Sequence, residues 1–167
     1  MARRSTRHDP AEALLRAWSA SARMNVFLIE RLTPAVWLAP PPEAVARANR
    51  TIAATFAHMH NCGLRYLART NPDAPVPAEL SRRPTAAQAK KALAAKRRVV
   101  LEVVGEALQQ GRRIVGFPHD AASYLIYYIA HDSHHRGQIA LQSRLLGHPL
   151  DTDTMSGLWQ WTKRAAE

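Results

Sequence analysis

The spacing of apolar side chains between prolines is the feature that most restricts the fold of this chain. Over residues 10–32 the apolar positions recur at steps of three and four, at Leu14, Leu15, Trp18, Ala22, Val26 and Ile29. This is the period of an amphipathic helix. Asp9 and Pro10 form an N-cap followed by proline at the first helical position. Thr33-Pro34 ends the segment, because a residue before proline avoids helical backbone angles.

Three further stretches carry helical signals. They span about residues 43–70, 84–110 and 121–146. The prolines between residues 72 and 84 exclude regular structure there. Gly111 and Gly147 suit helix C-caps, and Asp120 suits the N-cap of the last long helix. No stretch shows the alternation of apolar and polar residues that is typical of a strand.

Four long helices with short connections predict an all-α fold, a four-helix bundle, in one domain over residues 1–167. Its core spans about residues 10–148, and residues 1–9 and 150–167 are terminal extensions. The tail is expected to hold a short fifth helix, capped by Asp153 or Thr154, that lays Trp159 and Trp161 over one end of the bundle.

Composition limits the classes of function. No run approaches the ~20 apolar residues of a membrane span, and the basic N-terminus leads into no apolar signal core. With Cys62 as its single cysteine, the chain is expected to be soluble and cytoplasmic, with no membrane partner. The net charge of +10 is spread along the sequence, and no nucleic-acid-binding motif is present, so a nucleic-acid partner is disfavoured. Residues 90–98 are expected to form a solvated basic helix face, or less readily an anion-binding surface.

His131 and His135 are the strongest candidates for metal ligands. Residues four apart lie on one helix face, so both rings can turn a nitrogen toward one ion. The pair lacks the glutamate of the His-Glu-x-x-His zinc-protease motif, and Asp132 is a weak substitute for that general base. A peptidase mechanism is therefore disfavoured.

A third ligand is expected from the segment that holds His58 and His60. Helical periodicity allows either face to point inward, although the polar neighbours of His58 favour it. Cys62, one turn beyond His58, is either an occasional soft ligand or redox-sensitive neighbour, or a buried inert thiol.

The string His131-Asp132-Ser133-His134-His135-Arg136-Gly137-Gln138-Ile139 strongly resembles the last core helix of the DinB/YfiT-like superfamily. Residues 52–61 resemble that superfamily's second helix. The resemblance implies an up-down-down-up bundle, often dimeric, that binds zinc or nickel through three histidines. By motif position these are His58, His131 and His135, and His60 and His134 are neighbours. The DNA polymerase that shares the DinB name is unrelated.

The resemblance also implies a range of functions. Some relatives are S-transferases that use low-molecular-weight thiols, and many have no known activity. We therefore expect a metal-dependent thiol S-transferase or hydrolase acting on a small thiol or electrophile. A non-catalytic, stress-associated metal-binding protein is the alternative, and a basic nucleic-acid or partner-binding module is a weaker one.

Other residues near the expected site are candidates for supporting roles. Gln138 and Tyr128 are candidates to orient the imidazoles, and Tyr124 and Tyr127 to line the pocket. Arg65 and Arg136 are candidates to attract an acidic thiol, although solubility is the simpler role for either.

Overall fold

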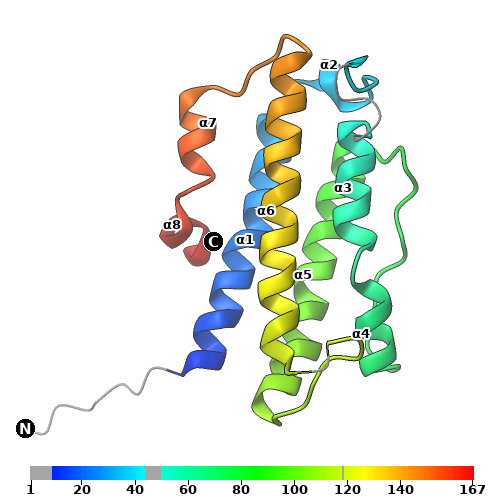
Figure 1. The fold of residues 1–167 in the computed structure, drawn as a ribbon, viewed down its shortest axis with the longest axis vertical. Coiled ribbons are helices and arrows are strands. Elements are labelled where there is room, and N and C mark those ends of the chain that lie inside the picture. The colour runs from blue at the N-terminus through cyan, green and yellow to red at the C-terminus, as the bar shows by residue number, and fades with distance from the viewer. Residues whose placement is uncertain (1–8, 44–49, 118) are drawn as a thin grey trace, which may run out of the picture.

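The computed structural model describes residues 9–43, 50–117 and 119–167, and these residues contain helices and no strands (Figure 1). The helices are α1 (Pro10–Arg31), α2 (Pro34–Trp37), α3 (Ile52–Asn61), α4 (Leu64–Thr70), α5 (Ala86–Gln109), α6 (Ala121–Leu145), α7 (Thr152–Gly157) and α8 (Trp161–Ala166). The prediction of an all-α fold is confirmed. Within the described ranges, no helix is both long enough and apolar enough to cross a membrane.

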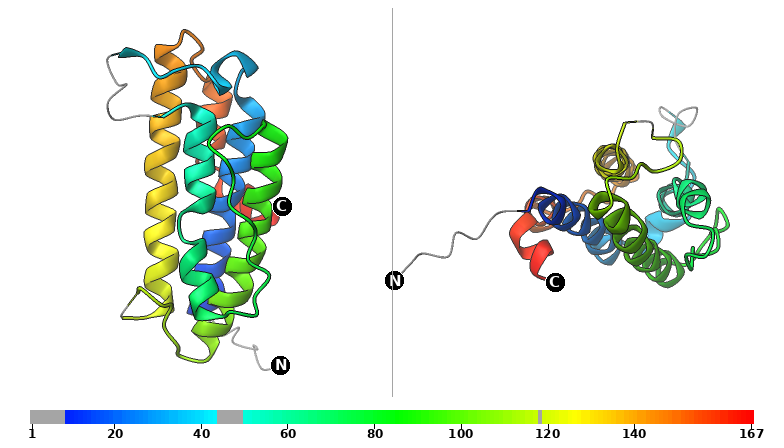
Figure 2. Two further views of the ribbon diagram at one scale, coloured as in Figure 1. Left: turned by 90° about the vertical axis from the view of Figure 1, so that its right-hand side faces the viewer. Right: turned by 90° about the horizontal axis from the view of Figure 1, so that it is seen from below.

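The long helices run side by side along one axis (Figures 1 and 2). In Figure 1, α1 ascends, α3 and α4 descend in succession, α5 descends and α6 ascends. The two descending units follow one another in the chain because the connection over residues 71–85 returns along α3. Both ends of the Asn61 side-chain amide bind the Leu80 backbone of this connection, at 2.8 and 2.9 Å.

Capping residues explain where most helices begin. The Asp9 carboxylate accepts from the Ala11 amide at the start of α1, and the Asp120 carboxylate accepts from the Ser123 amide at the start of α6. Thr85 and Gln88 form a reciprocal capping box at the start of α5. The N-caps that the sequence indicates at Asp9 and Asp120 are therefore confirmed.

The second expected helix, over residues 43–70, is wrong as a single element. Its residues 44–49 lie outside the described part of the chain, and α3 begins at Ile52 with Thr51 as its N-cap. The helix is also interrupted between α3 and α4. There Gly63 has a φ of +94°, and a Cβ at this position would lie 2.8 Å from Tyr124 Oη and Tyr128 Cζ. Only glycine combines a relaxed backbone at positive φ with the absence of a Cβ that would collide with the two tyrosines.

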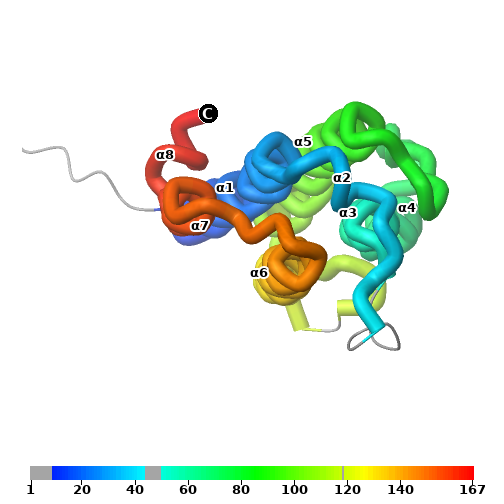
Figure 3. Tube along the Cα trace, turned by 90° about the horizontal axis from the view of Figure 1, so that it is seen from above, coloured from blue at the N-terminus to red at the C-terminus, as the bar shows by residue number. Residues whose placement is uncertain are grey.

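The tail differs from expectation in three ways. It forms two short helices, and the N-cap of α7 is Asp151 rather than Asp153 or Thr154. These helices lie along the outer side of α1 rather than over an end of the bundle (Figure 3). Trp159 is 78% exposed, so it covers no part of the core.

The core contains two apolar clusters, one toward each end of the bundle. Trp18, Val103 and Leu125 belong to one cluster, and Leu28 and Phe56 to the other. Polar side chains from α1, α3 and α6 lie between them, at the level of the histidines.

The basic stretch over residues 90–98 is not wholly solvated. Lys96 is 2% exposed, and its ammonium donates to the carbonyls of Met59 and Cys62 at 2.6 and 2.7 Å. Those are carbonyl groups at the C-terminal end of α3, where a helix leaves acceptors unpaired and where its dipole favours a cation. Lys96, which the sequence pattern placed on the surface, thus binds the carbonyl groups at the C-terminal end of a neighbouring helix.

Candidate metal centre

Three histidines meet between α3 and α6. The Nε2 atom of His131 lies 3.1 Å from Nε2 of His58 and 3.2 Å from Nε2 of His135. The rings of His58 and His135 pack edge to face, with their centroids 4.8 Å apart. The structure therefore brings together the three histidines that the sequence motif singled out.

The remaining histidines of these helices face elsewhere. His60 is fully buried, and its Nε2 lies 3.0 Å from the Ala78 carbonyl in the connection over residues 71–85. His134 is exposed on the outer side of α6. Of the two histidines that periodicity left open on α3, His58 is the one directed toward α6.

Each ring of the α6 pair is oriented by an acceptor at its other nitrogen. His131 Nδ1 lies 3.0 Å from Asp132 Oδ1, and His135 Nδ1 lies 2.7 Å from Gln138 Oε1. An ionised carboxylate and an amide oxygen can only accept, so both Nδ1 atoms carry a proton. Gln138 therefore orients an imidazole, as expected, and Asp132 is a partner that sequence analysis missed.

This assignment leaves a lone pair on both Nε2 atoms whenever the rings are neutral. At 3.2 Å the lone pairs of His131 and His135 would repel one another. A cation placed between them removes the conflict. A tetrahedral ion with metal–nitrogen bonds of ~2.0–2.1 Å holds its nitrogen ligands about 3.3–3.4 Å apart. The observed separations of 3.1 and 3.2 Å are close to that spacing.

The imidazoles of His58 and His131 have pKa values that are shifted in opposite directions. Burial, with the charge of Arg50 and of the neighbouring histidines, lowers the pKa of His58 to about 4. Burial also lowers the pKa of His131, but hydrogen bonds and charges from Asp132 and Cys62 outweigh it and raise that pKa to about 9. A divalent ion at these nitrogens would compete with a proton on His131.

A buried polar network extends behind His131 into α1. Asp132 Oδ2 accepts from Asn25 Nδ2 at 2.8 Å, and Asn25 Oδ1 accepts from Arg136 Nη1 at 2.7 Å. Asn25 is 1% exposed and Asp132 is 2% exposed. The sequence did carry a signal for this network, because Asn25 follows Trp18 and Ala22 on the apolar stripe of α1. A polar residue at such a position needs a buried partner.

Arg65 and Arg136, the two arginines expected to attract an acidic thiol, both use their guanidinium groups in hydrogen bonds to other residues. Arg136 is 7% exposed, and its guanidinium also donates to Ser21 and Ser133. Arg65 donates to the Tyr66 hydroxyl at 3.0 Å and lies over the Tyr66 ring. The supporting role of Arg136 is therefore structural, within the network that reaches Asp132.

Tyrosines surround the histidines on the side of α6 nearest α4. Tyr127 is 53% exposed and its ring stacks on that of His131, with an interplanar angle of 20°. Tyr124 is buried in the core. Tyr128 is also buried, and its hydroxyl lies 3.7 Å from Cys62 Sγ rather than on an imidazole. Tyr127 thus lies beside the histidines, while the Tyr128 hydroxyl is within hydrogen-bond distance of the Cys62 thiol.

Cys62 joins the same group of donor atoms. One ligand atom each from His58, Cys62 and His131 lie within 4.8 Å of one another. The three side chains are half-buried, and they form a cluster that could hold a metal ion. This cluster shares two members with the group of three histidines.

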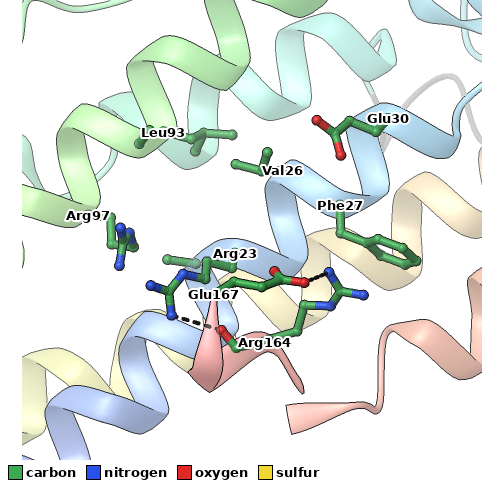
Figure 4. Close-up of a pocket in the computed structure, with 10 residues that line it drawn as sticks. Arg23, Val26, Phe27, Glu30, Leu93, Arg97, Arg164 and Glu167 are labelled. Carbon is green, nitrogen blue, oxygen red and sulfur yellow. Dashed lines mark hydrogen bonds and ion pairs between the residues drawn. The ribbon is translucent and has the colours of Figure 1, made fainter. Parts of the chain in front are cut away.

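A separate cavity lies between α1, α5 and α8, away from the histidines (Figure 4). It has a volume of about 210 Å³, and Arg23, Arg97 and Arg164 contribute to its walls. Arg23 donates to the carbonyl of Arg164 and so connects α1 to α8, whereas Arg164 pairs with Glu167 within the C-terminal segment. None of the candidate ligands lines this cavity.

An all-helical bundle with an imidazole and thiol cluster between facing helices defines a class of candidate metalloproteins. Residues 3–165 match the sequence model of the DinB family, so the chain belongs to the DinB family. Searches of curated proteins and of solved structures gave no match.

Proposed function

We propose that this DinB-family chain is a divalent-metal protein whose ion is held by His58, His131 and His135. The observation that carries the proposal is the close approach of His131 Nε2 to Nε2 of His58 and of His135, at 3.1 and 3.2 Å, with both Nδ1 atoms of the α6 pair bonded to acceptors. Neutral imidazoles arranged in this way fit a shared cation.

The ligand chemistry favours zinc or nickel. Imidazole suits both ions, and a bound ion would lower the pKa of a thiol or water at a remaining coordination position. Two residues of α6 orient the ligands. Asp132 and Gln138 hold the two α6 rings in the tautomer that presents Nε2, and such partners also raise ligand basicity.

We further propose that the reaction is thiol transfer or hydrolysis at a small electrophile, in the reducing cytoplasm. The exposed ring of Tyr127 beside His131 offers a flat apolar surface for a small substrate. A metal-binding role without turnover remains the competing function, and a screen of thiols against electrophiles by the metal-loaded protein separates the two.

The first test is elemental analysis of protein purified without a histidine tag. We expect about one zinc or nickel ion per chain, and loss of that ion in the His131→Ala/His135→Ala double variant. His134→Ala is the matched control, because His134 is exposed on the same helix. A double variant that retains its full metal content would overturn the assignment.

A second comparison tests the choice made on α3. His58→Ala is expected to lose metal, whereas His60→Gln is expected to keep it, because His60 bonds the Ala78 carbonyl. Metal loss in His60→Gln alone would show that the ligand on α3 was misassigned.

A further inference from the structure

The position of Cys62 is fixed by the break between α3 and α4. Cys62 is the C-cap of α3, and Gly63 then turns the chain with a φ of +94°. The buried ammonium of Lys96 binds the carbonyls of both Met59 and Cys62. An uninterrupted helix would lack this turn, so the break determines where the thiol lies.

The Cys62 side chain is directed into the donor cluster. Its Sγ lies within 4.8 Å of a ligand nitrogen of both His58 and His131. The Tyr128 hydroxyl lies 3.7 Å from Sγ, within hydrogen-bond distance of the thiol. Cys62 is half-buried, so its thiol is partly shielded from solvent.

We propose that the Cys62 thiolate is the fourth ligand of the metal centre in its resting state. The proposal rests on the proposed function, because it needs the ion held by the three histidines. His58, Cys62 and His131 form one donor cluster, and His135 lies 3.2 Å from His131 through their Nε2 atoms, so the four side chains together would supply the number of sulfur and nitrogen donors that a closed zinc site takes. On binding, the S–H bond breaks, the sulfur keeps the electron pair for the metal–sulfur bond, and the proton leaves to solvent.

Two chemical consequences follow. A thiolate donor selects zinc, cobalt or nickel over hard ions such as magnesium. An incoming thiol must displace Cys62 to reach the ion, and it can transfer its own proton to the released thiolate, so that no oxidant or reductant is needed. Cys62 would then control access to the fourth position.

Cobalt(II) substitution tests the proposal directly. Wild-type protein loaded with one cobalt ion per chain should show a near-ultraviolet thiolate-to-cobalt charge-transfer band. Cys62→Ser should bind cobalt with the band lost, and Cys62→Ala is a second variant in case the serine fails to fold. Because Cys62 is the single cysteine of the sequence, the band has no other source within the chain.

Alkylation of the wild-type protein gives an independent measurement. Iodoacetamide should modify Cys62 more slowly in zinc-loaded protein than in protein treated with chelator, as followed by intact mass. An equal rate in the two samples would overturn the proposal, whatever the variants do.

The outcomes separate this inference from the proposed function. Cobalt bound at one ion per chain without the charge-transfer band would overturn Cys62 as a ligand and leave the three histidines in place. No binding of cobalt, zinc or nickel would overturn both.

Discussion

At the scale of single residues, Asp132 shows how a side chain that is not a ligand contributes to the site. Its carboxylate bonds His131 through one oxygen and Asn25 through the other, so α1 fixes the orientation of a ring on α6. A carboxylate behind a ligating imidazole sets the tautomer and raises the basicity of the ligand. The sequence motif contains Asp132, but adjacency alone does not show that its carboxylate turns back to His131.

Asp132→Asn is expected to weaken zinc binding by roughly 10–100-fold, because the amide lacks the charge that stabilises the imidazole. Competition with a chromophoric chelator measures the affinity. Asp120→Asn is the matched control, since asparagine also caps a helix and Asp120 lies at the start of α6 without contact to the histidines. Equal affinities in the two variants would contradict the role given to Asp132.

Lys96 predicts a pH dependence of stability. Burial lowers the pKa of Lys96 below its unfolded value of about 10.4, so the unfolded chain binds more protons between the two values. Wild-type stability should therefore rise, relative to Lys96→Met, as the pH increases through the interval between the two pKa values, and the difference should level off above about 10.4. Urea unfolding of both proteins at neutral and alkaline pH measures it. If the stability of the wild type relative to Lys96→Met fell with rising pH, burial would not disfavour the charged form of Lys96.

At the scale of elements, the break between α3 and α4 is the feature with the greatest effect on the site. Gly63→Ala should destabilise the fold by about 1–3 kcal/mol, because alanine is strained at positive φ and its Cβ would meet Tyr124 and Tyr128. Gly137→Ala is the matched control. Nothing lies within 4 Å of its added Cβ in the middle of α6, so it should stabilise by about 0.5–1 kcal/mol. Thermal unfolding should give shifts of opposite sign.

The same element shows what the sequence could and could not predict. Residues 52–70 have helical periodicity throughout, and Gly63 resembles a tolerated glycine until the tyrosines of α6 are placed against it. The histidine pair on α6 was predictable, because both members lie on one helix at a fixed spacing. The burial of Lys96 was not, because its partners come from another helix and depend on packing. For Cys62 and Asn25 the sequence indicated a possible role, but their partners on α6 also depend on packing.

At the scale of the whole molecule, the proposed ion joins α3 to α6. Chelation should therefore lower the unfolding temperature. A ligand present at 100 times its dissociation constant stabilises the native state by about 2.7 kcal/mol, which corresponds to roughly 5–10 °C for a chain of this size. Calorimetry with and without EDTA measures the shift, and the His131→Ala/His135→Ala variant should show none.

The outer surface predicts self-association. A groove between α6 and α7 is lined mainly by apolar side chains together with Arg144, and the exposed Trp159 lies beside it. Its apolar members are Ala140, Leu141, Pro149, Leu150 and Met155. The family resemblance led us to expect a homodimer, and this is the surface that we expect it to use. Leu141→Glu should reduce the mass measured by light scattering to that of one chain. Leu38→Glu, a change of an exposed leucine beside α2, should not. A wild-type protein that is already monomeric would contradict the prediction.

The separation of His58 and His131 by 73 residues has a consequence for biogenesis. A ribosome would have synthesised α1 through α5 before the His131 codon is read, so the emerging chain offers an ion at most His58 and Cys62. Capture with full affinity must then wait until α6 has docked beside α3. Metal loading of this chain would therefore follow folding and report on it, and the proposed ion would take no part in bringing the first helices together.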